Sequence, residues 1–435
     1  MKRLLWVSEA NPANTSGGMS MSETLIFENA FLIDGTGGEP QEGRRIVVAD
    51  GTIREVSASS GAKPVGRVID LRGQVLLPGL IDAHVHIGSV EVRNHLTAQL
   101  PPAVYVLRAC KNLENDLDLG FTTVRDAAGL DAGFRTAVEQ GLVRGPRLFL
   151  STTPLSQSGG NTPGYGPGPD RPMPRNALGI VPEICDGPHE VRAASRRALG
   201  RGADQIKVFA DGEVLASQAA DRAKPGQWKF SIEELRAAVE VADAAGTYVM
   251  AHAYAAKAIQ NCVQAGVRSI EHGNLMDDDT ARLMAERGAF FVPTLITYDL
   301  LVKFGKSWGL DDYSLEKLAL VGQAGRRALE LAHRAGVKIA SGSDIVGPMQ
   351  GLKGGEMAIK AEVLGSMGAI VAQTKTNAEL LNVSDRLGTV EPGKLADLIV
   401  LDGDPLKDPG LFADGLAHVR MVVKDGRVMK DTLGR

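Results

Sequence analysis

The chain contains little that would suit a disulfide-stabilised, secreted protein. Its 435 residues include only three cysteines, Cys110, Cys185 and Cys262. No two of them form a Cys-x-x-Cys pair, and an odd number is a poor basis for a disulfide framework. We therefore expect a reducing, cytoplasmic compartment and assign these cysteines no redox role.

Aromatic residues, excess charge and long apolar runs are also scarce. Aromatic residues make up 5% of the chain, and its formal net charge is −4. Neither value favours nucleic acid or an anionic membrane as a partner. The apolar stretch near the N-terminus is too short for a signal peptide, and no window reaches the ~18 apolar residues of a membrane helix. We expect a small-molecule substrate as the partner, and a homo-oligomer of the chain itself.

The patterning divides the chain into three parts. Residues 1–22 are polar and rich in Gly and Ser, which predicts a disordered leader. Beyond them, both ends of the chain alternate apolar and polar residues around Asp-Gly turns, as β-hairpins do. We predict that residues 23–78 and 388–435 form one small β-sandwich domain built from both termini. Residues 79–387 between them carry a different pattern.

Eight short apolar runs alternate with amphipathic helical segments in this middle part. Such alternation is typical of a (β/α)₈ TIM barrel, an α/β fold of about 250 residues. Two long irregular segments, 153–176 and 211–230, follow the third and fourth runs, where a barrel has its active site, and long loops there are often functional. The eight runs are 79–86, 121–126, 147–152, 204–210, 247–252, 267–272, 289–294 and 337–344.

Four of the eight histidines stand at the ends of these predicted strands. His84 and His86 are one residue apart, so their side chains point the same way from one strand. Taken alone, the pair could be two partly exposed residues. Because catalytic groups of barrels gather at this rim, and histidine is a common metal ligand, the whole set predicts a metal site. The set comprises His84, His86, His252, His272 and Asp344.

A lysine lies inside the fourth predicted strand. Lys207 has apolar neighbours on both sides, and a buried ammonium group costs several kcal/mol unless it is neutralised or paired. One interpretation is a structural ion pair with Glu271 or Asp344. The other is that burial lowers the lysine pKa, which supplies a free amine. That amine can add CO₂ to form a carbamate, whose two oxygens suit two metal ions.

These motifs resemble those of the amidohydrolase superfamily, which includes dihydroorotase, urease and phosphotriesterase. The segments GLIDAHVH, QIKVF, MAHAY, IEHGN and GSD occur in that family's order. The segment RLGTVEPGKLADLIVLDGDPL is similar to the family's segment that leads from the barrel back into the β domain. The resemblance covers nearly the whole chain and indicates the binuclear type with a carbamylated lysine.

The resemblance implies a role for each residue of the set. Lys207, as a carbamate formed from CO₂, would bridge two divalent ions together with a hydroxide. Asp344 would take the proton of that hydroxide and pass it to the leaving amine. The nitrogen-rich mixed ligand set favours Zn²⁺, with manganese and cobalt as alternatives. The more buried ion would be held by His84, His86 and Asp344, and the second by His252 and His272.

Within the superfamily, the segments MAHAY, VRSIEHGNLMD and VPTLITYD look most like the metal-dependent dipeptidase and amidase branch. That branch contains prolidase-like enzymes, Arg/Lys carboxypeptidases and ochratoxin-type amidases. Tyr254, two residues after His252, would donate a hydrogen bond to substrate, unless it only packs at the strand end. Where the branch commonly has Gly-Gly-His, this chain has Asn161, which can donate a hydrogen bond but carries no charge. Non-peptide amides, carbamates and ureas therefore remain open as substrates.

The sequence thus predicts a metal-dependent hydrolase of an amide-type C–N bond, in a dipeptide, an N-acyl amino acid or a related amide or carbamate. Two alternatives stay open. The first is a hydrolase or deaminase of a cyclic, imidazolone-type substrate, although deaminases usually lack the bridging lysine that Lys207 would supply. The second is a non-catalytic scaffold of the same fold, against which the complete ligand set argues.

Overall fold

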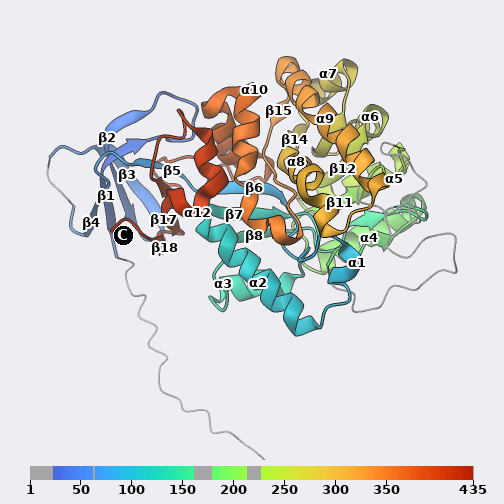
Figure 1. Cartoon of the computed structure of the whole chain (residues 1–435), viewed down its shortest axis with the longest axis horizontal. Helices are drawn as coiled ribbons and strands as arrows, with labels where there is room; N and C mark the ends of the chain where they lie inside the picture. The colour runs from blue at the N-terminus through green and yellow to red at the C-terminus, as the bar shows by residue number, and fades with distance from the viewer. Residues whose placement is uncertain (1–22, 62–63, 161–178, 213–226, 435) are drawn as a thin grey trace, which may run out of the picture.

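The computed structural model describes residues 23–61, 64–160, 179–212 and 227–434. Within these ranges the chain has one mixed sheet of eight strands and two parallel sheets of seven and three strands. Figure 1 shows the mixed sheet on one side and the helices around the parallel strands on the other. The predicted leader, 1–22, lies outside the described residues. No helix in the described part is long and apolar enough to cross a membrane.

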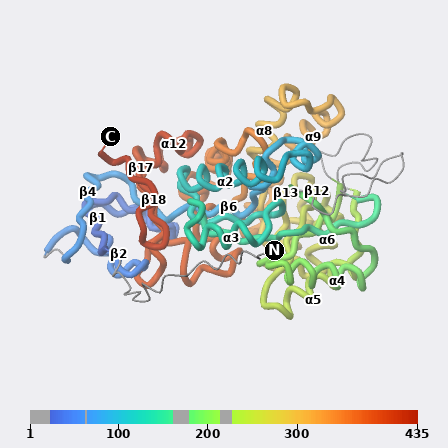
Figure 2. The backbone as a smooth tube through the Cα atoms, turned by 90° about the horizontal axis from the view of Figure 1, so that it is seen from below, coloured from blue at the N-terminus to red at the C-terminus, as the bar shows by residue number. Residues whose placement is uncertain are grey.

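Strands from both ends of the chain share the mixed sheet. They are β1 (Leu25–Leu32), β2 (Gln41–Ala49), β3 (Thr52–Ala58), β4 (Arg67–Asp70), β5 (Val75–Pro78), β16 (Leu398–Leu401), β17 (Val419–Lys424) and β18 (Arg427–Asp431). The order is β18-β17-β16-β5-β1-β2-β3, with β4 also paired to β1. β16 joins the two halves, because Leu398 lies opposite both Pro78 of β5 and Val423 of β17. Figures 1 and 2 both place these strands together.

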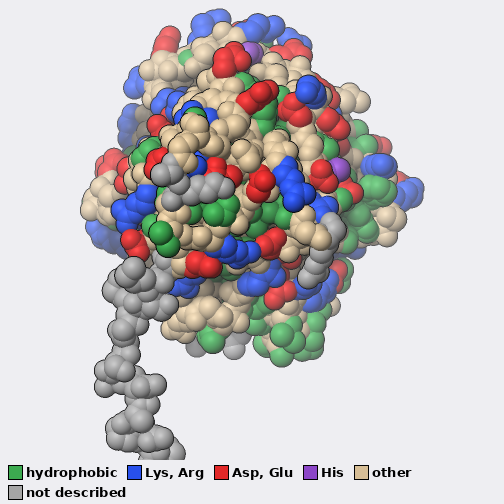
Figure 3. All heavy atoms as spheres, turned by 90° about the vertical axis from the view of Figure 1, so that its left-hand side faces the viewer, with side chains coloured by type: hydrophobic (Ala, Val, Ile, Leu, Met, Phe, Trp, Pro, Cys, Tyr) green, Lys and Arg blue, Asp and Glu red, His purple; other side chains and the backbone are tan. Residues whose placement is uncertain are grey.

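Hydrogen bonding joins the terminal strands into one continuous sheet, while the packing of this sheet as a β-sandwich stays a prediction. β5 pairs with β1 on one side and β16 on the other, so hydrogen bonding runs unbroken between the two halves. The sheet buries one face in an apolar cluster that includes Phe27, Ile46 and Met421. On the side of the molecule seen in Figure 3, acidic and basic side chains are interspersed.

Each of the eight predicted runs contains a parallel strand. These are β6 (Leu80–Val85), β7 (Phe121–Asp126), β8 (Arg147–Leu150), β11 (Ile206–Phe209), β12 (Val249–Ala255), β13 (Ser269–Leu275), β14 (Phe290–Val292) and β15 (Lys338–Ile339). Two short strands, β9 (Leu155–Ser156) and β10 (Glu183–Ile184), were not predicted. β9 continues the third run after a break at Thr152, whose φ is +53°. β8 therefore pairs with β7, whereas β9 pairs with β11 through Leu155 and Val208.

The two parallel sheets are joined by isolated backbone hydrogen bonds instead of ladders. The Asp204 nitrogen donates to the Leu150 carbonyl at 2.7 Å, and the Ala83 nitrogen donates to the Ser341 carbonyl at 2.9 Å. The eighth predicted run forms only the two-residue strand β15 before the chain turns into the site. The α/β class and the order of strands are those of the predicted fold, while closure of the (β/α)₈ ring at these joins stays a prediction.

Helices pack outside the parallel strands (Figure 1). The α-helices are α1 (Asn94–Thr97), α2 (Pro102–Asp118), α3 (Ala132–Glu139), α4 (Gly187–Gly200), α5 (Ile232–Ala244), α6 (Ala256–Ala265), α7 (Asp278–Arg287), α8 (Leu295–Phe304), α9 (Asp312–Ala335), α10 (Gly355–Val371), α11 (Asn377–Leu380) and α12 (Gly415–His418). The capping box predicted before α5 is present, because Ser231 and Glu234 exchange hydrogen bonds of 2.7 and 3.2 Å. Short 3₁₀ or π turns are η1 (Gly305–Trp308), η2 (Gly347–Leu352), η3 (Ala372–Thr376) and η4 (Pro409–Asp414).

Polar and apolar contacts tie the terminal sheet to the parallel strands. Arg147 of β8 lies 2.9 Å from a carboxylate oxygen of Asp397 and also pairs with Asp425. One apolar cluster runs from Leu77 in β5 to Phe121 in β7. The terminal strands and β6–β8 therefore share a core, which fixes the strand that carries the His-x-His pair.

We predict that Gly342→Ala destabilises the fold. A Cβ atom there would lie 2.5 Å from the Cβ of His84 and 2.8 Å from Cγ1 of Val292. Overpacking of this kind costs about 1–3 kcal/mol. Urea denaturation should show a lower midpoint at an unchanged slope. Gly351→Ala is the control, since its nearest atom would be 3.8 Å away, and equal losses in both variants would contradict the prediction.

Candidate metal centre and active site

The predicted histidines converge at the carboxyl ends of three strands. His84 and His86 come from β6 and the residue after it, His252 from β12 and His272 from β13. The ring centroids of neighbouring members lie 4.7–5.3 Å apart. All four side chains are buried. The structure thus brings together residues that are separated by up to 188 positions in the chain.

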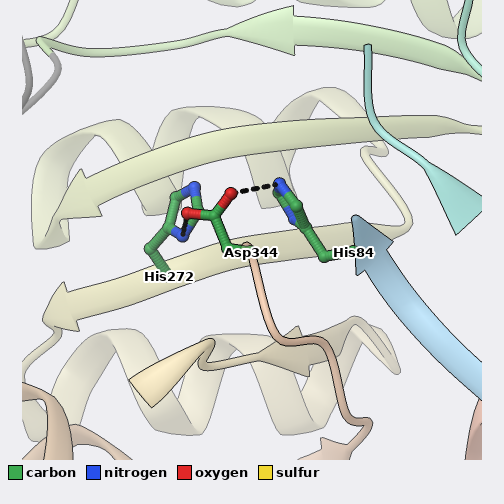
Figure 4. Close-up of side chains that lie close together, drawn as sticks. All are labelled: His84, His272 and Asp344. Carbon is green, nitrogen blue, oxygen red and sulfur yellow. Dashed lines mark ion pairs between the residues drawn. The ribbon is translucent and has the colours of Figure 1, made fainter. Parts of the chain in front are cut away.

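Asp344 faces three of these histidines. Its Oδ1 lies 3.3 Å from Nε2 of His86 and 3.6 Å from Nε2 of His84, and its Oδ2 lies 3.9 Å from Nδ1 of His272. Figure 4 shows the carboxylate between His84 and His272. One possible ligand atom from each of His84, His272 and Asp344 lies within 4.8 Å of the other two. Such spacing suits a single metal ion.

Burial favours the neutral form of every imidazole in the cluster. Burial, followed by the charge of Lys207, lowers the pKa of His86 to about 4. Burial also lowers the pKa of His84, His252 and His272 well below the usual value. Nε2 of His84 is buried with no hydrogen-bond partner among the described residues. Neutral imidazoles with a nitrogen left open are the form that binds a metal ion, so the residues fit one.

Three of the four histidines are held at Nδ1 by an oxygen atom behind the site. Such a partner fixes the tautomer and orients the ring, which leaves Nε2 for a metal ion. The pairs are His84 with Oε2 of Glu271 at 2.7 Å, His86 with the Ala128 carbonyl at 2.8 Å, and His272 with Oγ1 of Thr294 at 2.8 Å.

A buried ion pair supports His84 from behind, and the sequence analysis assigned it no role. Nη2 of Arg125 lies 2.9 and 3.0 Å from the two carboxylate oxygens of Glu271. Ser269 donates a further hydrogen bond to Glu271 at 2.6 Å. The sequence did offer a signal for this ion pair, because Arg125 is a charged residue inside an apolar run, as Lys207 is.

Lys207 occupies β11 with its side chain almost fully buried. Its Nζ lies 5.5 Å from the ring centroid of Phe209. Its charge contributes to the lowered pKa values of His84 and His252. Lys207 lines the same pocket as His86, His252, His272 and Asp344. The pocket therefore gathers all the predicted ligands except His84, whereas the carbamate stays a prediction.

Tyr254 forms part of the pocket wall, with its ring centroid 4.6 Å from that of His252. The hydroxyl of Tyr298, a residue of α8 that the sequence analysis did not single out, donates to the Tyr254 hydroxyl at 3.3 Å. Asn161 lies outside the described residues, so its place near the substrate stays a prediction. The apolar part of the wall consists of Ile180, Phe209, Leu301 and Val346.

Comparison with known proteins places these residues in a family. The sequence profile of the Amidohydrolase family matches residues 75–429, which is most of the chain. The chain belongs to the amidohydrolase family. The matched range begins in β5 and ends in β18, so it includes the residues of the candidate metal centre and the C-terminal strands of the mixed sheet.

Individual relatives confirm the predicted branch. Ochratoxinase of Aspergillus niger is 30% identical over 431 residues, covering 94% of this chain and 86% of that protein. A solved prolidase in complex with N-methylphosphonate-L-proline is 41% identical, with a TM-score of 0.89, over 94% of this chain and 100% of that one. A Xaa-Pro dipeptidase structure with bound methionine is 33% identical, with a TM-score of 0.82 and the same coverage. This amidohydrolase is therefore a hydrolase related to amide- and peptide-cleaving enzymes.

We predict that the metal-free amidohydrolase loses stability as the pH falls. The pKa of His86 is about 4 in the folded protein and about 6.5 in an unfolded chain. Between these values the unfolded chain binds more protons, so the free energy of unfolding decreases with falling pH. The contribution is complete above pH 6.5 and lost by pH 4, roughly 3 kcal/mol.

Urea unfolding of the chelator-treated protein at pH 7, 6 and 5 measures this dependence. His86→Asn should flatten it, whereas the exposed His333 offers a control in which His333→Asn leaves the slope unchanged. The same slope in wild type and His86→Asn would contradict the assignment.

Proposed function

We propose that this protein hydrolyses an amide-type C–N bond in a dipeptide, an N-acyl amino acid or a related amide or carbamate, using two divalent metal ions. The observation that carries the proposal is the cluster of four buried imidazoles around one carboxylate, of which three imidazoles and the carboxylate line a single pocket. The relatives support the bond class, since they include an ochratoxinase, a prolidase and a Xaa-Pro dipeptidase.

The donor set suits two zinc ions. It combines neutral nitrogen ligands with one carboxylate, and Lys207 lies beside them, where addition of CO₂ to its amine would give a bridging carbamate. Bound ions would polarise the scissile carbonyl and lower the pKa of water towards 7. One ion would be held by His84, His86 and Asp344, the other by His252 and His272, with Lys207 between them.

Asp344 is the residue placed to move protons. Its side chain keeps 20% exposure in the pocket, whereas the histidines around it are almost fully buried. In the proposed reaction it accepts a proton from the attacking water as the C–O bond forms. It then delivers that proton to the nitrogen as the C–N bond breaks, which releases an acid and an amine.

The two tyrosines and the apolar wall would orient the substrate. The Tyr254 hydroxyl donates to the carbonyl oxygen, where negative charge develops, while Tyr298 holds that hydroxyl in place. Phe209, Leu301 and Val346 line the same pocket. They would bind an apolar group beside the scissile bond and exclude water from it.

The proposal predicts metal-dependent hydrolysis. Protein purified without chelator should contain about two metal ions per chain, as two-metal hydrolases do. A screen of dipeptides, N-acyl amino acids, aryl amides and carbamates with Zn²⁺ present should find turnover that chelation abolishes and Zn²⁺ restores. Turnover of a cyclic imidazolone alone would favour the alternative substrate class, and a reproducible absence of metal would refute the proposal.

Lys207→Ala and Asp344→Asn should both lose activity, but with different effects on metal content. The lysine variant loses the predicted bridge, so its metal content should fall together with its activity, and a short carboxylic acid in the buffer should restore part of both. Asp344→Asn keeps an oxygen of similar shape but accepts no proton. It should retain more metal than the lysine variant while kcat falls by roughly two to four orders of magnitude.

Metal content and kcat of the two variants are measured side by side. A near-normal kcat in Asp344→Asn would show that another group handles the proton. Full metal content in Lys207→Ala would show that this lysine is structural, as in the ion-pair interpretation.

A further inference from the structure

One residue of the pocket wall is held in place by a side chain from a distant part of the sequence. Ile180 lines the pocket together with Phe209 of β11, Leu301 of α8 and Val346. Unlike Phe209 and Leu301, Ile180 belongs to no helix or strand, since it lies just before the two-residue strand β10. Its place in the wall therefore depends on contacts between its own segment and other parts of the chain.

Asn94, the first residue of α1, contacts both polar groups of the Ile180 backbone. The Ile180 nitrogen donates a hydrogen bond to Oδ1 of Asn94 at 3.0 Å, and Nδ2 of Asn94 donates to the Ile180 carbonyl. A carboxamide can do this because it carries an uncharged donor and an acceptor side by side. A neighbouring β-strand binds a residue through the same two groups. The pair of hydrogen bonds thereby fixes the backbone at Ile180 and the direction of its side chain.

The segment that contains Ile180 also lies unusually close to α1. Gly179 has a φ of +82°, and a Cβ atom there would lie 2.7 Å from Oδ1 of Asn94 and 2.9 Å from Cγ2 of Thr97. A side chain at this position would push the Asn94 amide away, so glycine permits the approach. On the other side of Ile180, β10 pairs with β9. Ile180 is thus anchored both before and after its own position.

We propose that Asn94 is a positioning residue that acts through the Ile180 backbone to set the apolar wall of the pocket, and thereby selects substrates by the size of the apolar group beside the scissile bond. The inference rests on the proposed function and adds to it a residue behind the wall, because Asn94 itself is not among the residues that line the described pocket. The favoured substrate is an amide with an aliphatic or aromatic group on one side of the bond.

Two substitutions separate the clamp from the wall. Asn94→Leu keeps a side chain of similar size but loses both hydrogen bonds, so the Ile180 side chain no longer keeps one position. Ile180→Ala removes the apolar contact and leaves the Asn94 amide its backbone partners. One missing methylene in an apolar pocket changes discrimination by roughly 10- to 200-fold. Each substitution should therefore lower the preference for a large apolar group about 10-fold.

Selectivity is measured with the full chain and Zn²⁺, as the ratio of kcat/KM between probes with a large and a small side chain. The probes are the dipeptides Ala-Xaa and Xaa-Ala and the N-acetyl amino acids, with Gly, Ala, Leu or Phe as Xaa, so that both sides of the bond are varied. Combining Asn94→Leu with Ile180→Ala should give the same ratio as Ile180→Ala alone, whereas independent residues would add their effects. Gln99→Ala, at an exposed residue shortly after α1, is the matched control and should keep the wild-type ratio.

Amide hydrogen exchange tests the clamp without any substrate. The Ile180 amide is hydrogen-bonded to Asn94, so peptides that cover it should be protected in the wild type and lose this protection in Asn94→Leu. Gln99→Ala should keep the protection. Metal content should be the same in the wild type and in Asn94→Leu, because the Asn94 amide contacts the Ile180 backbone and, within the described residues, no candidate metal ligand.

Four results overturn the inference. Equal protection of the Ile180 amide in wild type and Asn94→Leu would show that the clamp is not formed. If Asn94→Leu changes kcat/KM by the same factor for small and large probes, Asn94 only supports the fold. If the effects of the two substitutions add in the double variant, Asn94 does not act through Ile180. The proposed function stands in these three cases. If the metal-loaded wild type cleaves none of the probes, the proposed function fails for these substrates and the selection fails with it, while hydrogen exchange still reports the clamp.

Discussion

The candidate site depends on one constraint, which is the burial of four imidazoles together with the charged side chains beside them, away from water. Three of the imidazoles have an oxygen partner at Nδ1, since an unpaired buried polar group costs free energy. Glu271 shows how tightly this is arranged, because Arg125, Ser269 and His84 all contact its carboxylate. The same desolvation lowers the imidazole pKa values and leaves nitrogen lone pairs that suit a metal ion. Stability and ligand chemistry thus have one physical cause.

The backbone around the site is unusual in the same place. His272, Thr294 and Asp344 have φ values of +74°, +50° and +52°. Such conformations cost about 1–3 kcal/mol in residues other than glycine and persist where the surroundings impose them. Thr294 and Asp344 follow β14 and β15, whereas His272 lies within β13. The left-handed backbone at these three residues therefore occurs where their side chains meet in the candidate site.

The sequence predicted the elements better than their connections. Period-two alternation and apolar runs located eight of the ten parallel strands in the described residues, and the His-x-His spacing identified a shared face. The break at Thr152, which gives β8 and β9 different neighbours, has no local signature, because strand pairing depends on residues far along the chain. The pairing of β5 with β16 likewise has no local signature, since hairpin patterns do not reveal contacts between distant strands. Arg125, Thr294 and Tyr298 escaped because their importance lies in contacts made only after folding.

These missed residues connect the candidate ligands to the pocket wall. Thr294 contacts Nδ1 of His272 and also hydrogen-bonds Tyr298, whose hydroxyl reaches Tyr254. One chain of contacts thereby links the orientation of His272 to the hydroxyl of Tyr254 in the pocket wall. Polar networks in a low-dielectric interior are worth more than their separate parts, so a change at one member alters the geometry of the others. The shape of this pocket then depends on the residues behind the candidate metal ligands as well as on those that line its surface.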